Sequence, residues 1–204
     1  MIICGAGGHA RELMHCFPEI TRNAVLFDNI NGLDLFGEHQ VIHSREQLKE
    51  HFKQDNRFAL GIGLPKHREM LYQLMHECGG VYNAMISRNT AFGLCSETTF
   101  QADVFPLSFI GPDVQIGRGT LINTRASVHH DAVIGRFCEI GPGAIVLGNA
   151  VIGDGVQLGA GSVVLPHVCI ASNVIVAAGA VVTRNVDSSS MVAGVPAIVK
   201  KNFG

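Results

Sequence analysis

The sequence is poor in charge. Only 16% of its 204 residues are Asp, Glu, Lys or Arg, against about 25% in ordinary soluble domains. It has no tryptophan, and residues 155–183 contain no charged side chain at all. A net charge of −2 and a pI near 6.5 exclude the basic surface typical of proteins that bind nucleic acid or anionic membranes. The 47% of hydrophobic residues excludes a disordered chain.

Two further features are missing. No basic segment precedes the first apolar run, MIIC, so no secretory signal peptide is expected. The six cysteines form neither a C-x-x-C pair nor a spacing typical of metal sites, which predicts free thiols in a cytoplasmic protein. The uncharged stretch 155–183 is long enough for a membrane span, since about 20 apolar residues suffice.

A strict six-residue repeat accounts for that stretch differently. Every sixth residue from 104 to 182 is Val, Ile or Leu, and the residue four places further on is small or β-branched. Period six fits neither an α-helix nor a simple strand, but it is typical of a parallel β-helix. A membrane-spanning helix has no use for such a register, so no membrane span is expected.

The N-terminal half has another texture and reads as a small Rossmann-like α/β domain. Strands are expected at 2–3, 25–27, 58–62 and 81–84, and helices at about 9–17 and 65–77. Ser44 and Gln47 form a capping box before a further helix. We therefore predict a mixed fold: an α/β nucleotide-sugar-binding domain at 1–85, a connector at 86–103, a β-helix at 104–187 and a C-terminal exit segment at 188–204.

The first glycine turn predicts a phosphate site. Gly5-Ala-Gly7-Gly8-His9-Ala10 follows a strand and opens a helix, and amides at a helix N-terminus favour phosphate or diphosphate. Asp28 and Asn29 follow the second strand, near the place of a ribose-binding acid. The turn favours a nucleotide or nucleotide sugar as ligand. The domain is about half the size of a full dinucleotide fold, which weakens the case for NAD as the ligand. A purely structural turn remains an alternative.

A second turn, residues 61–68, lies at another strand end, and strand ends of a parallel sheet share one crevice. Gly63 and Arg68, with Lys66, are candidate contacts for a diphosphate there. The alternative is a solvated basic start of a helix.

His129, His130 and Asp131 interrupt the composition of the hexads but not their register. An unperturbed imidazole suits proton transfer near neutrality, and a neighbouring carboxylate can orient it. The segment 121–135 resembles the active-site stretch, N-T-x5-H-[DE]-x2-I-G, of the sialic acid O-acetyltransferase-like proteins, including bacillosamine-pathway acetyltransferases. These are hexapeptide acyltransferases with a left-handed β-helix and an N-terminal G-x-G-G-H domain, so the resemblance covers nearly the whole chain.

The resemblance implies specific roles. His130 would be the general base, Asp131 would orient it, and Asn123 would help hold the reacting groups. Acetyl-CoA would lie in a groove between subunits of a homotrimer. Small residues 18 apart stack on one side of such a prism and leave backbone amides accessible, and the candidate coenzyme contacts are Gly148, Ala160 and Ala178. Glu139 stands where some relatives have a second His near the thioester, and is a further candidate.

The function implied is acetyl-CoA-dependent N-acetylation of a nucleotide-linked amino sugar, of the 4-amino-4,6-dideoxy type, for bacterial glycan precursors. O-acetylation of a sialic acid or related sugar is the alternative within the class, and a non-catalytic β-helix scaffold is the alternative outside it. A metal site of the γ-carbonic anhydrase kind needs three His ligands with an H-x4-H pair. His129, His130 and His167 lack that spacing, so no metal is expected.

Overall fold

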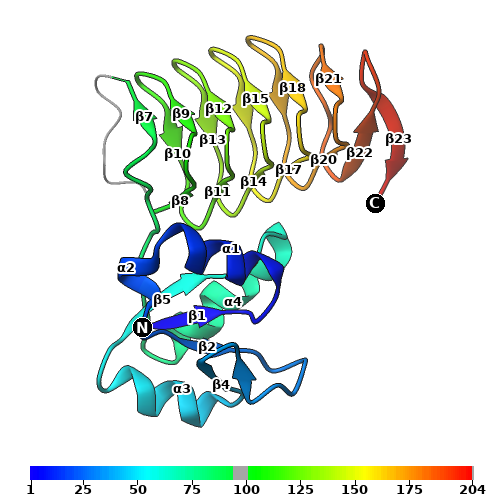
Figure 1. Ribbon diagram of the computed structural model, residues 1–204. Coiled ribbons are helices and arrows are strands. Elements are labelled where there is room, and N and C mark those ends of the chain that lie inside the picture. The colour runs from blue at the N-terminus through cyan, green and yellow to red at the C-terminus, as the bar shows by residue number, and fades with distance from the viewer. Residues whose placement is uncertain (94–100, 204) are drawn as a thin grey trace. The chain divides into compact units, whose positions relative to one another are not determined.

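A computed structural model describes residues 1–93 and 101–203 (Figure 1). The chain divides into two compact units, Met1–Met85 and the residues from Ile86 onward. Among the described residues, no helix is both long and apolar enough to cross a membrane.

The first unit is an open, mainly parallel sheet in the order β3-β4-β2-β1-β5-β6, in which only β3 pairs antiparallel. Its strands are β1 (Ile2–Cys4), β2 (Val25–Phe27), β3 (Leu35–Phe36), β4 (His39–Ile42), β5 (Arg57–Leu60) and β6 (Val81–Tyr82). Its helices are α1 (Gly8–Cys16), α2 (Pro18–Thr21), α3 (Arg45–Phe52) and α4 (Pro65–Glu77). The predicted α/β class is confirmed, although β3 and β4 were not expected and β5 and β6 end earlier than predicted.

Strand alternation builds two apolar layers in this unit. Ile2 and Cys4 pack with Phe58 and Leu60 against the apolar sides of α3 and α4 in one buried cluster. Ile3, from the opposite face of β1, lies beside Ala10 of α1 at Gly61. The capping box predicted for α3 is present: Ser44 Oγ accepts a hydrogen bond from the Gln47 amide, and the Gln47 side chain accepts one from the Ser44 amide.

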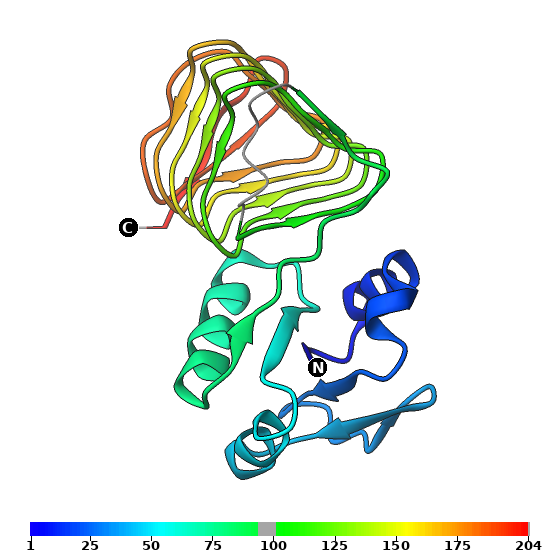
Figure 2. The same cartoon turned by 90° about the vertical axis from the view of Figure 1, so that its left-hand side faces the viewer.

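The second unit is the β-helix that the hexads predicted. The coils contribute two-residue strands in turn to three sheets. Strands of neighbouring coils pair in parallel, and paired residues are 18 apart, as Val133 and Val151 show. Only the last pair of strands, Ser190–Ala193 and Ile198–Asn202, is antiparallel. Figure 2 views the stack nearly end-on and shows its triangular section. One sheet contains β10 (Gln115–Ile116), β13 (Val133–Ile134), β16 (Val151–Ile152) and β19 (Cys169–Ile170).

The other two sheets run along the remaining sides. The second contains β7 (Ala91–Phe92), β9 (Phe109–Ile110), β12 (Ser127–Val128), β15 (Ile145–Val146), β18 (Val163–Val164) and β21 (Val181–Val182). The third contains β8 (Asp103–Val104), β11 (Leu121–Ile122), β14 (Glu139–Ile140), β17 (Gln157–Leu158), β20 (Ile175–Val176), β22 (Ser190–Ala193) and β23 (Ile198–Asn202).

The hexad positions fill the interior of this prism. All fourteen aliphatic residues of the series join its core, and only Ile116 among them is partly exposed. The small or β-branched residues four places later are buried as well, for example Ala126, Cys138 and Ser162. None of the described residues in this core is charged, so every coil stacks on its neighbour through apolar contacts and backbone hydrogen bonds.

The corners follow a second six-residue series that was not predicted from the sequence. Every sixth residue from Leu107 to Gly179 adopts a left-handed backbone conformation, with φ between 51° and 69°. Five of these positions are glycine, and others are Asp or Asn, the residues that tolerate this conformation best. Leu107 and Phe137 also occupy it, so residue type alone conceals the pattern.

The β-helix starts earlier than predicted. Ile86 forms a parallel bridge with Val104, and β7 pairs with β9, so residues 86–93 are not a connector. Asp103 belongs to β8. Residues 94–100 of the predicted connector lie outside the described residues.

Candidate active site

Because positions 18 apart stack, each prism edge is one column of side chains. We name the three columns after the residues at the first corner position. This is the position two places after each inward aliphatic residue, directly before the left-handed position. The histidine edge consists of Pro112, His130, Gly148 and Pro166. The small-residue edge consists of Thr124, Pro142, Ala160 and Ala178. The charged edge consists of Arg118, Arg136, Asp154 and Ser172. The three edges differ in chemistry, although the same backbone builds them.

His130 and Asp131 form a hydrogen-bonded pair at one corner of the histidine edge. Nδ1 of His130 lies 2.7 Å from Oδ2 of Asp131. Since a carboxylate only accepts hydrogen bonds, this contact assigns the proton of the neutral ring to Nδ1 and leaves a lone pair on Nε2. The side chains are 58% and 50% exposed, so a substrate can approach them. The pair thus has the geometry of an oriented general base.

His129 has a different environment. Its ring lies 5.5 Å, between centroids, from that of Phe109, at an interplanar angle of 55°. This contact packs His129 against the neighbouring coil, in keeping with a structural role.

Asn123 does not join the pair within one chain. It lies at the preceding corner, beside Thr124 of the small-residue edge, and is 7% exposed. Its Oδ1 accepts a hydrogen bond from the Thr124 amide at 2.8 Å. The strand β12 separates this corner from that of His130. Sequence spacing alone did not reveal this separation.

The four candidate coenzyme contacts lie at different places on the β-helix. Ala160 and Ala178 lie on the small-residue edge, where the Gly179 amide donates to the Ala160 carbonyl at 2.9 Å. Glu139 lies on β14 and accepts a hydrogen bond from Gln157 Nε2 at 3.0 Å. Gly148 lies on the histidine edge directly beside the imidazole of His130. One chain therefore does not gather these four residues at one place.

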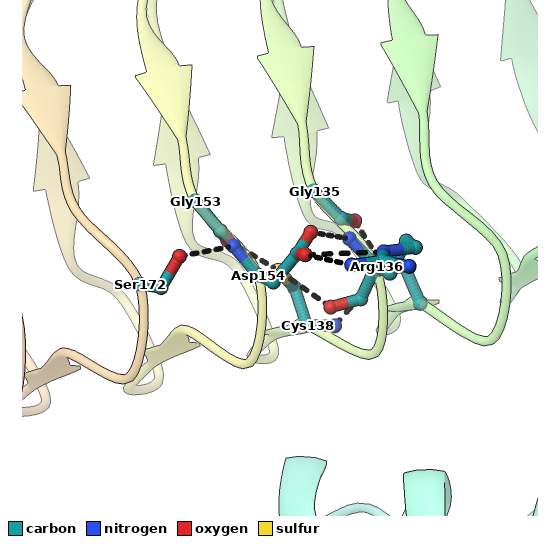
Figure 3. Close-up of polar contacts among 7 residues, drawn as sticks. Gly135, Arg136, Cys138, Gly153, Asp154 and Ser172 are labelled. Carbon is teal, nitrogen blue, oxygen red and sulfur yellow. Dashed lines mark hydrogen bonds and ion pairs between the residues drawn. The ribbon is translucent and has the colours of Figure 1, made fainter.

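The charged edge is a structural ladder (Figure 3). Asp154 accepts hydrogen bonds from Nη2 and Nε of Arg136, at 2.6 and 3.0 Å, and from the Arg136 amide at 2.7 Å. Hydrogen bonds from the Arg136 side chain are the main reason that the pKa of Asp154 lies below its usual value. Beside it, burial raises the pKa of the Cys138 thiol to about 12, and its Sγ contacts the Gly153 carbonyl at 3.0 Å. Cys138 is therefore no nucleophile.

The first unit has its own cavity, of about 250 Å³, at the carboxyl ends of β1, β2 and β5. Gly7, Gly8 and His9 line it at the start of α1, and Asp28 and Asn29 line it after β2. No atom lies within 4 Å of where a Cβ on Gly7 or Gly8 would be, so this turn opens to the cavity. No side chain caps α1, and its first amides are available for an anion.

Asp28 bonds mainly to its own loop, and the Ala6 amide of the glycine turn is a further partner. Its Oδ1 accepts hydrogen bonds from the Ile30 and Asn31 amides, and its Oδ2 accepts one from Asn31 Nδ2 at 2.7 Å. Burial alone raises the pKa of Asp28, but these hydrogen bonds outweigh it, and the pKa is lowered. Asp28 is thus ionised and shapes the cavity wall.

His9 is neutral at physiological pH. Burial, and then the positive charge of Arg68, lower the pKa of His9 to about 4. A neutral ring can offer one donor and one acceptor to a ligand in the cavity.

Arg68 and Gly63 do not line this cavity. Arg68 is fully buried, and its Nη1 donates to the carbonyls of Leu60, at 3.3 Å, and Ile62, at 2.6 Å. The expectation that Arg68 meets a diphosphate is therefore wrong, because its guanidinium secures the end of β5 instead. His67, Met70 and Leu71 of α4 also line the cavity and were not predicted from the sequence. A helical spacing from His67 to Leu71 was the available signal.

A second hollow, of about 420 Å³, adjoins the first and shares Phe27, Asn29, Met70 and Leu71 with it. His43, Arg45 and Glu77 line its far part, where Arg45 and Glu77 form an ion pair at 3.0 Å. The two hollows offer room for an elongated ligand with a phosphate at the glycine turn. Nowhere in the described ranges, 1–93 and 101–203, does a group of three His, Cys, Asp or Glu side chains suit a metal ion.

Comparisons with known proteins agree with this architecture. Residues 108–148 and 149–184 match the bacterial transferase hexapeptide family (six repeats). No curated protein matches the sequence significantly. The acetyltransferase domain of PglB from Neisseria gonorrhoeae is 21% identical and has a TM-score of 0.86, with 98% of each chain covered. At this identity the likeness shows the fold.

A mutant of GDP-perosamine N-acetyltransferase from Caulobacter crescentus, solved with CoA and GDP-perosamine, is similar in sequence as well. It is 28% identical and has a TM-score of 0.82, with 98% of this chain and 96% of that chain covered. The second unit thus has the left-handed β-helix fold of the hexapeptide repeat. In both of its parts the chain resembles these sugar N-acetyltransferases, the family that its motifs predicted.

Proposed function

We propose that this protein transfers the acetyl group of acetyl-CoA to the amine of a nucleotide-linked amino sugar, of the 4-amino-4,6-dideoxy type. The observation that supports this function most is the His130–Asp131 pair on a hexapeptide β-helix, in which the His130 side chain is 58% exposed. The cavity at the glycine turn supports a nucleotide diphosphate as the handle of the acceptor. Bacterial glycan precursor synthesis is the biological setting that fits such a substrate.

The reaction follows from this arrangement. The amine nitrogen attacks the thioester carbonyl carbon while Nε2 of His130 accepts a proton from that nitrogen. Asp131 stabilises the resulting imidazolium through Nδ1. The tetrahedral intermediate then expels the coenzyme A thiolate, which takes up the proton, and the acetamido sugar remains. General-base catalysis of this kind contributes about 10²- to 10⁴-fold.

The distribution of candidates over two edges supports a homotrimer with shared sites. The outward row of the β7–β21 sheet, which lies between these edges, includes Phe109, Ile145, Val163 and Val181. Phe109 is 37% exposed, and the other three are partly exposed. A cyclic contact through this apolar sheet would bring the histidine edge of one copy toward the small-residue edge of the next. A monomer in analytical ultracentrifugation would contradict this assembly.

We also propose a cytoplasmic location. Cys4, Cys16, Cys78, Cys138 and Cys169 are free thiols, which fits a reducing compartment. Labelling of the intact cell with a membrane-impermeant reagent should leave the protein unmodified.

A thiol-release assay tests the activity directly. Acetyl-CoA is offered with UDP-, GDP- and dTDP-linked 4-amino-4,6-dideoxy sugars, and mass spectrometry locates the new acetyl group. Turnover with one of these sugars, lost by about 10²- to 10⁴-fold in His130→Ala, is expected. Acetylation of a sialic acid hydroxyl would favour the O-acetyltransferase alternative. A protein that binds no coenzyme A in calorimetry would be the scaffold instead.

A further inference from the structure

Gly148 occupies a backbone position that does not require glycine. The equivalent first corner positions of other hexads carry a wide range of side chains. They are Arg136, Pro142, Asp154, Ala160, Pro166, Ser172 and Ala178. Gly148 is absent from the glycines with positive φ, which occupy the next corner position, as Gly143 and Gly161 do. Neither the turn nor its backbone conformation explains this glycine.

Close packing of the backbone does not explain it either. Glycines that follow an inward aliphatic residue, such as Gly117 and Gly159, are required because a Cβ there would lie 2.5 to 2.6 Å from backbone atoms of the next coil. The three atoms nearest to a Cβ on Gly148 would instead all belong to the imidazole of His130. This Cβ would lie 2.5 Å from Cε1, 2.5 Å from Nε2 and 3.1 Å from Nδ1.

We propose that Gly148 is a positioning residue for His130: its missing side chain lets the Cε1–Nε2 edge of the imidazole lie close to the next coil while Nδ1 bonds to Asp131. Any side chain at 148 would occupy the place of the ring edge from Nδ1 to Nε2. The ring would then swing toward solvent, and the hydrogen bond to Asp131 would break. The proposal rests on the proposed function only for its effect on turnover.

This role differs from the coenzyme contact suggested by sequence for the same residue. A glycine needed only for coenzyme A would act on acetyl-CoA binding and leave the ring of His130 where it is. If the glycine is needed for the ring, replacing it changes the tautomer of His130 even when no coenzyme is bound. The two roles therefore separate experimentally.

The experiment compares Gly148→Ala, His130→Ala and the double variant with the original protein. We expect Gly148→Ala to lower kcat by about 100-fold, the effect of a displacement near 1 Å, with an unchanged KM for acetyl-CoA. The double variant should equal His130→Ala, because the added methyl then has no ring to displace. Pro166→Ala changes the same corner position one coil below and should leave kcat unchanged.

The second readout does not depend on activity. In ¹⁵N spectra of the imidazole at alkaline pH, His130 should be the Nδ1–H tautomer in the original protein and a mixture in Gly148→Ala. If no acetyl transfer occurs at all, this change still supports the positioning role while the proposed function fails. An unchanged tautomer, or an effect on the KM for acetyl-CoA alone, overturns the proposal. If Gly148→Ala misfolds, a folded double variant supports it, and a misfolded double variant contradicts it.

Discussion

Asp113 and Asp131 occupy the same left-handed corner position one coil apart, with φ of 56° and 59°, yet only Asp131 follows a histidine. The Asp131 carboxylate is bonded to Nδ1 of His130, whereas Asp113 follows Pro112. Two residues of the same type and backbone conformation thus form a natural pair of test and control.

Asp131→Asn should lower kcat by at least about 100-fold, because it removes the charge that stabilises the imidazolium while Asn keeps the left-handed turn. Steady-state kinetics with acetyl-CoA and the amino sugar measures the effect. Asp113→Asn makes the same change one coil above and should leave kcat unaltered. Equal losses in both variants would mean that the corner, and not the pairing with His130, matters.

Arg68→Met should destabilise the first unit by about 2–4 kcal/mol, since the carbonyls of Leu60 and Ile62 lose their buried donor. Both tyrosines of the chain, Tyr72 and Tyr82, lie in this unit, so tyrosine fluorescence during urea unfolding reports on it alone. Lys66→Met, at an exposed position of the same helix, should have little effect. A stable Arg68→Met variant would show that the guanidinium is dispensable.

His9 should make the first unit sensitive to mild acid. The unfolded chain protonates His9 below pH 6.5, but the folded protein does so only near pH 4, where burial and Arg68 hold the pKa of His9. Between these values the unfolded state binds more protons, so stability falls as the pH falls, by on the order of 3 kcal/mol in all.

His9→Gln should flatten this dependence, as measured by tyrosine-monitored urea unfolding across that pH range. His15→Gln, an exposed position on the same helix, should keep it. A wild-type slope in His9→Gln would assign the acid sensitivity to another group.

Asp154→Asn should weaken the β-helix at neutral pH by less than about 1 kcal/mol, because the ion pair with Arg136 is partly exposed. The pKa of Asp154 is lowered in the folded state, so its contribution is present above the unfolded pKa near 4 and is lost as the pH falls through the lower folded value. Thermal unfolding by circular dichroism should show a smaller loss of Tm on acidification in Asp154→Asn. An identical acid response would contradict a role for this pair.

Much of the fold could be predicted from the sequence because each position in the hexad has a single structural role. An inward aliphatic residue such as Ile140 and a buried corner residue such as Ala144 recur without exception, so the period survives in a single sequence. The left-handed corner series was hidden because Leu107 and Phe137 accept the strained conformation. The short strand β4 was missed because its first residues, His39 and Gln40, do not look like a buried strand.

The candidate site could be predicted from the sequence where its residues are neighbours along the chain. His130 and Asp131 are neighbours, and their pairing follows from the motif. Arg68 was misplaced because a basic residue near a glycine turn is equally suited to a phosphate or to buried carbonyls, and only burial distinguishes the two. The proximity of Gly148 to His130 was not predicted, since the two residues are 18 apart and lie in neighbouring coils.

Coil periodicity also sets which changes in chain length this protein tolerates. Removing 18 residues below His130 would shorten the prism by one coil but return every later residue to its own edge. Removing six would rotate each later residue onto the next edge, so that Asp154 would take the place of Gly148 beneath the imidazole. Only insertions or deletions of 18 residues therefore keep every side chain on its own edge. Changes of other lengths would need to be confined to loops that protrude from the corners.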